Sequence, residues 1–173
     1  MGETCGVAYC PLDRDFAAVY RSAVQKLAAM HPDMILLDDD YRLNVRPYYM
    51  GCFCPLHLQE YEKRLGERIE RGDLERLIFT GGPNKYRDAY MQLSADTLLD
   101  FSHMLRKAVD EVDPTIRLSA CACYDNWDFC GTDNMAIARA LAGNTAPYLR
   151  TIGAPYWNHH KEIIDVIEDT RMQ

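Results

Sequence analysis

Two stretches of this sequence repeat the same succession of elements: the end of a helix, a break at an x-Pro pair and a short apolar strand. The first copy is residues 27–38 (LAAMHPDMILLD) and the second is residues 108–119 (AVDEVDPTIRLS). Proline ends a helix because it has no amide proton and disfavours helical backbone in the residue before it. Helices that alternate with buried strands are typical of an α/β fold with a parallel sheet. The repeated unit therefore predicts this fold class.

Helix caps, helix breakers and the periodicity of apolar residues predict the remaining strands and helices. The predicted strands are residues 6–9, 34–39, 116–122 and 150–154. The predicted helices are one capped by Asp13 or Asp15, then 55–65 with a possible extension to 71, 89–112, 134–142 with Asp133 as its cap, and 160–171. The short run 77–79 ends in the turn signal Gly81-Gly82-Pro83-Asn84.

Four strands are too few for a closed barrel. A full (β/α) barrel takes eight strands and ~250 residues, whereas this chain has 173. We therefore expect one α/β domain over residues 1–173, with parallel strands arranged as in an incomplete TIM barrel of roughly half the usual size.

The net charge of the chain limits the classes of binding partner that can be expected. The formal net charge is −7 and no Lys/Arg cluster occurs, which argues against nucleic acid and anionic membranes and favours a neutral ligand such as a carbohydrate. No apolar run approaches the ~18 residues of a membrane span, and no signal peptide is visible. The seven cysteines are an odd number, which fits a reducing compartment. The expected location is the cytoplasm.

Acids and aromatic residues follow the predicted strands. The apolar run 34–37 ends in Asp38, Asp39 and Asp40, and carboxylates at the end of a buried strand indicate a pocket there. In this interpretation Asp40 is a general acid whose pKa is raised by its neighbours, and Arg42 pairs with Asp38 or binds a substrate hydroxyl. The alternatives are a loop-anchoring cluster that pairs with arginines, and a divalent cation held by two of the acids.

The ends of the later strands supply further candidates for substrate binding. Aromatic rings at strand ends can stack on the apolar face of a sugar ring or simply pack between helices. The candidates are Asp125, Trp127, Tyr156 and Trp157.

The array Cys52-Phe53-Cys54-Pro55-Leu56-His57 has spacing suited to metal ligands. Zinc sites need four N/S ligands, and this loop offers three of them. The alternative is that the cysteines only pack beneath a helix start. Cys121, Cys123 and Cys130 are expected to pack rather than react.

The segment LLDDDYR…GCFCPLHLQEYEKRL resembles the fourth-strand region of the zinc-containing β-galactosidases of glycoside hydrolase family forty-two. There a strand ends in Asp-Asn-Glu-Tyr and is followed by a C-x-C-x-x-C cluster, with a further cysteine from the preceding loop. The resemblance implies a zinc site at Cys10, Cys52, Cys54 and His57, a proton donor at Asp40 and a sugar contact at Asp39. The segment is also similar to bacterial glycosidase-like barrel proteins with Asp-Asp-Asp-aromatic-Arg and Cys-Phe-Cys-Pro.

Three departures from the family qualify what it implies. Asp40 stands in place of a glutamate, Asp39 in place of an asparagine and His57 in place of the third cysteine. The partner carboxylate of the family lies on a later strand, so the chain alone is expected to be inactive. The expectation is thus a glycosidase-like barrel segment with carbohydrate as ligand, completed by the remaining barrel half or by a homo-oligomer. The rivals are a non-catalytic zinc-stapled module that binds carbohydrate or protein, and a thiol redox protein.

Overall fold

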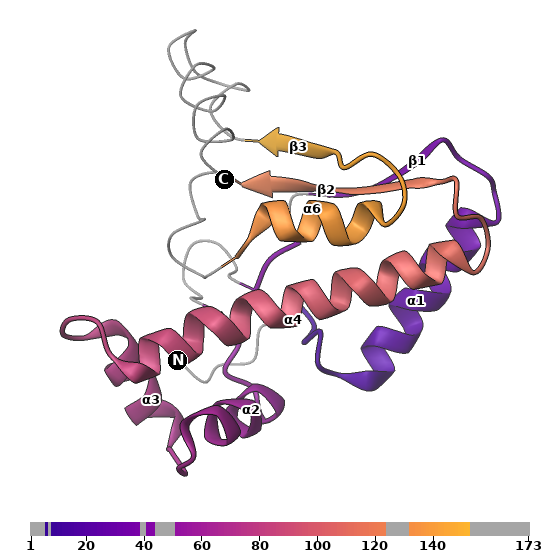
Figure 1. Cartoon of the computed structure of the whole chain (residues 1–173). Coiled ribbons are helices and arrows are strands. Elements are labelled where there is room, and N and C mark those ends of the chain that lie inside the picture. Colours follow the sequence, from indigo (N-terminus) through magenta and orange to yellow (C-terminus); the bar gives the residue numbers. More distant parts are fainter. Residues whose placement is uncertain (1–5, 7, 39–40, 44–50, 124–131, 153–173) are drawn as a thin grey trace, which may run out of the picture.

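The computed structural model describes residues 6, 8–38, 41–43, 51–123 and 132–152 (Figure 1). This part of the chain is mixed α/β, as the sequence predicts, with three successive helices between its first and second strands. Their bounds are α1 Arg14–Ala28, β1 Met34–Leu37, α2 Pro55–Leu65, α3 Arg71–Phe79, α4 Lys85–Asp110, β2 Arg117–Cys123, α6 Asn134–Ala142 and β3 Leu149–Ile152. None of the helices in these ranges is long and apolar enough to cross a membrane.

The strands form one parallel sheet in the order β1-β2-β3. Ile35 lies opposite Leu118 in the first pair, and Arg150 lies opposite Cys121 in the second. This confirms the predicted parallel sheet and its three later strands. The prediction of a first strand at 6–9 is wrong for residues 8 and 9, which belong to no strand. Tyr9 is 77% exposed, and the chain turns directly after it, with Asp13 N–H donating to the Cys10 carbonyl.

The helices α1, α4 and α6 all pack on one face of the sheet (Figure 1). The main core joins apolar side chains of that sheet face to those of the three helices. The strands contribute Ile35, Leu37, Leu118 and Ala120, and the helices contribute Val24, Ala28, Leu98, Phe101, Leu105, Val109, Ile137 and Leu141. Burial of each large side chain contributes about 1.5–3 kcal/mol. Leu36 points to the opposite face and is 41% exposed.

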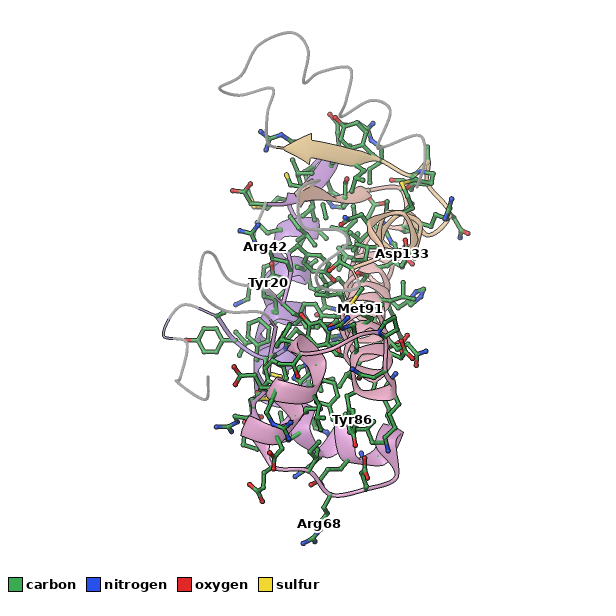
Figure 2. The ribbon with its side chains drawn as sticks, turned by 90° about the vertical axis from the view of Figure 1, so that its left-hand side faces the viewer. Tyr20, Arg42, Arg68, Tyr86, Met91 and Asp133 are labelled. Carbon is green, nitrogen blue, oxygen red and sulfur yellow. The ribbon has the colours of Figure 1, made fainter. Side chains whose placement is uncertain are left out.

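A second apolar cluster lies beyond the sheet, where α2 and α3 pack against the N-terminal half of α4 (Figure 1). In Figure 2, Arg68 lies at this end of the molecule and Arg42 lies near the sheet. The cluster contains Phe53, Tyr61, Leu74, Ile78, Ala89, Tyr90 and Leu93. The run 77–79, from which we predicted no helix, is the last turn of α3. Leu74 and Ile78 are four residues apart and both enter this cluster, which favours the helix.

Side-chain caps define the starts of α1, α4 and α6. Asp13 accepts from Phe16 N–H at 2.8 Å and Asp133 from Ala136 N–H at 2.8 Å, as predicted for both. Asn84 accepts from two amides at the start of α4, so that helix begins four residues earlier than the sequence indicated. The predicted helix 160–171 lies outside the described residues.

Candidate metal centre

Four side chains from two separate segments converge at one point. Cys10 precedes α1, Cys52 and Cys54 precede α2, and His57 lies in the first turn of α2. Their ligand atoms all lie within 4.8 Å of one another, so the group could hold a metal ion. The structure thus brings together the four residues that the sequence nominated.

The distances within the cluster are close to those of a tetrahedral site. Cys10 Sγ lies 3.2 Å from His57 Nδ1, Cys54 Sγ lies 3.5 Å from Cys10 Sγ, and Cys54 Sγ lies 3.6 Å from His57 Nδ1. With Zn–S bonds of about 2.3 Å and Zn–N bonds of about 2.0–2.1 Å, a regular tetrahedron has S–S edges of about 3.8 Å and S–N edges of about 3.6 Å. These three distances fit a small ion with adjustments of a few tenths of an ångström, and the other ligand separations, which are at most 4.8 Å, would close by at most about 1 Å.

The backbone of the cysteine loop is held by the second apolar cluster. Phe53 is 7% exposed and stacks on Tyr61 and Tyr90, with ring centroids 5.9 and 6.1 Å away. Arg71 Nε donates to the Phe53 carbonyl at 2.9 Å. Because Phe53 points into the cluster, the cysteine on either side of it can project the other way.

The ends of this loop are shaped by a glycine and a proline. Gly51 has a φ of 100°, and a Cβ built there would lie 3.0 Å from the Tyr90 ring, so both the backbone and the space favour glycine. Cys54 is the N-cap of α2 and Pro55 follows at the first helical position, where proline is well tolerated.

The close contacts among the sulfur atoms shift the pKa values of Cys10 and Cys54 in opposite directions. The neighbouring thiols of Cys52 and Cys54 raise the pKa of Cys10 far above its usual range. The thiols of Cys10 and Cys52 lower the pKa of Cys54, and the side chain and backbone of His57 act in the same direction. Burial lowers the pKa of His57, but the contacts with Cys52 and Cys54 outweigh it and raise the value to about 9. The pKa directions thus favour a thiolate at Cys54 beside an imidazolium at His57. A bound metal cation would take the place of the imidazolium proton and would likewise stabilise the thiolate.

His57 is the most enclosed member of the cluster, with 1% of its surface exposed. Its Nδ1 faces the sulfurs, and its Nε2 is buried without a hydrogen-bond partner in the described part of the chain. Metal-bound histidines usually donate the other ring N–H to an acceptor. Three cysteines, one histidine and this enclosure are typical of closed structural sites rather than open catalytic ones.

A second polar group lies at the carboxyl edge of the sheet. Arg150 Nη1 lies 3.4 Å from Cys121 Sγ and 4.0 Å from Asp38 Oδ1. Parallel pairing explains this, because Arg150 is opposite Cys121 and Asp38 follows the residue opposite Ala120. The Asp38 side chain is 87% exposed, and the group lies on the sheet face away from the helices. Arg150 was not among the site residues predicted from the sequence. A charged residue inside the last predicted strand, 150–154, could have indicated a polar contact at the sheet.

Arg42 and Tyr41 are described just beyond the acids. Arg42 is half-buried. The Tyr41 hydroxyl lies 2.7 Å from Ser102 Oγ and donates to the Leu98 carbonyl at 3.2 Å, which ties the segment after β1 to α4. The other predicted site residues lie outside the described part of the chain: Asp39, Asp40, Asp125, Trp127, Tyr156 and Trp157.

Fold and site together define an α/β protein with a parallel sheet and a Cys₃His candidate metal centre at the start of α2. No protein-family model, curated protein or solved structure matches the chain significantly.

Proposed function

We propose that the chain is a zinc-stapled segment of a glycosidase-like (β/α) barrel, whose sugar-binding face is formed at the carboxyl ends of the strands. The observation that carries the proposal is the winding of the sheet. The strands are neighbours in chain order, and α1, α4 and α6 all cover the same face (Figure 1). A doubly wound sheet has helices on both faces, whereas a barrel has them on its outside only.

The polar group at the carboxyl edge supports the same proposal. Asp38, Cys121 and Arg150 lie on the sheet face opposite α1, α4 and α6, which would be the inside of the proposed barrel, and at the end of the strands where barrel active sites form. In this arrangement Asp38 and Arg150 supply an acceptor and donors for sugar hydroxyls. Asp39 and Asp40 follow directly in the chain, with Asp40 as proton donor and Asp39 as a sugar contact.

Zinc is the proposed metal because three thiolates and one imidazole form a soft, tetrahedral donor set without a redox requirement. The ion would cross-link the segment before α1 to the start of α2. It would thereby hold both ends of a stretch that contains β1 and the three acids, and its role would be structural.

Two measurements test the proposal. Metal analysis of the purified protein should find one zinc per chain, which Cys54→Ser removes and Cys121→Ser retains. Both tryptophans follow predicted strands, so their fluorescence should respond saturably to a sugar in a panel of monosaccharides and aryl glycosides. Asp39→Ala should weaken that response, whereas Asp73→Ala on the exposed side of α3 should not. If none of the sugars changes the fluorescence, the proposal of sugar binding is wrong. If the purified protein contains no zinc, the proposal of a zinc cross-link is wrong.

A second candidate function is a non-catalytic zinc-stapled module that binds carbohydrate or protein. The observation in its favour is that all four metal ligands would come from the protein. Such a set leaves no open position for a substrate and indicates a structural rather than a catalytic metal. Sugar binding without turnover of aryl glycosides, in a chain that also contains the partner carboxylate, would favour this candidate.

A further inference from the structure

The sulfur atoms of Cys10 and Cys54 are in contact although α1 and β1 lie between them in the chain. Their Sγ atoms are 3.5 Å apart, and both residues are only half-buried, so small oxidants can reach them. A disulfide brings the sulfurs to about 2.05 Å with Cβ atoms about 3.5–4.5 Å apart. Closing the gap therefore needs a movement of about 1.5 Å, which side-chain rotation within a half-exposed cluster can supply.

We propose that Cys10 and Cys54 form a reversible disulfide, so that a covalent cross-link takes the place of the metal cross-link under oxidising conditions. The exchange with metal rests on the proposed zinc site, whereas the disulfide requires only the two cysteines. The oxidant is a hydroperoxide such as hydrogen peroxide.

The chemistry balances in two steps. One sulfur attacks a peroxide oxygen, the O–O bond breaks, and a sulfenic acid and one water form. The second sulfur then attacks the sulfenic sulfur, the S–S bond forms and the hydroxyl leaves as water. The two sulfurs lose two electrons and the peroxide gains them. In the zinc form two protons are taken from solvent, and the ion loses two of its four ligands and dissociates.

The loop geometry favours Cys10–Cys54 over a bond between Cys52 and Cys54. Those two cysteines flank Phe53, whose ring is stacked in the second apolar cluster and whose carbonyl is held by Arg71. A bond between them would close a tight ring across that anchored residue. Cys121 is 4% exposed and contacts Arg150 at the sheet edge, so it lies in a different environment and serves as a control.

As a consequence, the segment before α1 stays cross-linked to α2 even after the metal is lost. In the reduced protein the ion joins the segment before α1 to α2, and in the oxidised protein the S–S bond joins the same two points. Cys52 and His57 alone are too few ligands to retain zinc in a structural site.

The test uses Cys5→Ser protein, so that Cys10 is the sole cysteine of its segment. Metal-stripped protein treated with one equivalent of hydrogen peroxide should become two hydrogen atoms lighter, and dithiothreitol should reverse this. Fragmentation of the linked peptides should place the bond between Cys10 and Cys54. Adding Cys52→Ser or Cys121→Ser should leave the cross-link intact, and adding Cys54→Ser should abolish it. The oxidised protein should melt at a higher temperature than the reduced, metal-stripped protein.

Several results would overturn the proposal: a dominant bond to Cys52, oxidation to sulfinic acid without a cross-link, or equal melting temperatures. In zinc-loaded protein, release of zinc should parallel the loss of two thiols. If the protein binds no zinc but still forms the Cys10–Cys54 bond, the proposed metal site fails and the disulfide stands.

Discussion

Gly143 ends α6 at a φ of 56°, and a Cβ placed on it would lie 2.9 Å from Cδ of Arg106. Arg106 cannot withdraw easily, because it is 4% exposed and donates to the carbonyls of Ile116 and Leu141 at 2.9 and 3.3 Å. The glycine thus leaves room for an arginine that connects the last turns of α4 and α6 to the start of β2.

Gly143→Ala should lower the free energy of unfolding by about 2–4 kcal/mol, because left-handed strain adds to a steric clash with a fixed side chain. Urea denaturation measures the change. Gly66→Ala is the matched control. Its φ is 70°, but among the described residues no side chain and no backbone outside its own helix and chain neighbours lies within 4 Å of the added methyl group, so only the strain of about 1 kcal/mol is expected. Equal losses for the two variants would show that Arg106 is free to move.

His57→Cys should retain one zinc per chain. The change gives a four-cysteine donor set and removes the buried Nε2–H that has no acceptor among the described residues. His57→Phe should lose the metal, because it keeps the bulk of the ring without a ligand atom. Metal analysis after dialysis distinguishes the two, with the exposed His103→Ala as control. Retention of zinc by His57→Phe would mean that His57 is not a ligand.

Phe53→Ala should weaken zinc binding although Phe53 carries no ligand atom. The ring fixes the loop between two ligands, and loss of such support typically costs 10–100-fold in metal affinity. It should also lower the free energy of unfolding by about 3–5 kcal/mol, while Phe53→Leu should lose less than about 1.5 kcal/mol and keep most of the affinity. Competition with a chromophoric chelator measures affinity. An unchanged affinity in the alanine variant would separate the apolar cluster from the metal site.

Tyr41 should contribute to a loss of stability at alkaline pH. Burial raises the pKa of Tyr41 above its usual value. The group is protonated in both states below the unfolded pKa of about 10, and above it the unfolded chain alone ionises. Stability should therefore fall above pH ~10, by about 1.4 kcal/mol per pH unit for this tyrosine. Comparison of the slopes for wild type and Tyr41→Phe isolates the contribution, and identical slopes would contradict it.

The sequence predicts those features that depend on neighbours along the chain. The caps at Asp13 and Asp133, the strand that begins at residue 34 and the ligand spacing of Cys52, Cys54 and His57 follow from local pattern. Cys10, the fourth ligand, was predicted from the resemblance to a zinc-containing family. The helical end of α3 was missed because an apolar run of three followed by glycines reads equally as a strand. The contact of Arg150 with Asp38 depends on the register of parallel strands, which no local pattern encodes.

The order of the strands has a kinetic consequence. β1 pairs directly with β2, yet α2, α3 and the whole of α4 lie between them in the chain. Joining such distant segments requires loop closure before any sheet contact forms, which slows folding. Contacts among α4, β2 and α6 are closer in sequence and should form first, with β1 added late. The loop on the carboxyl side of β1 should therefore be among the last parts of the chain to be organised, and a metal ion that binds early would shorten that delay.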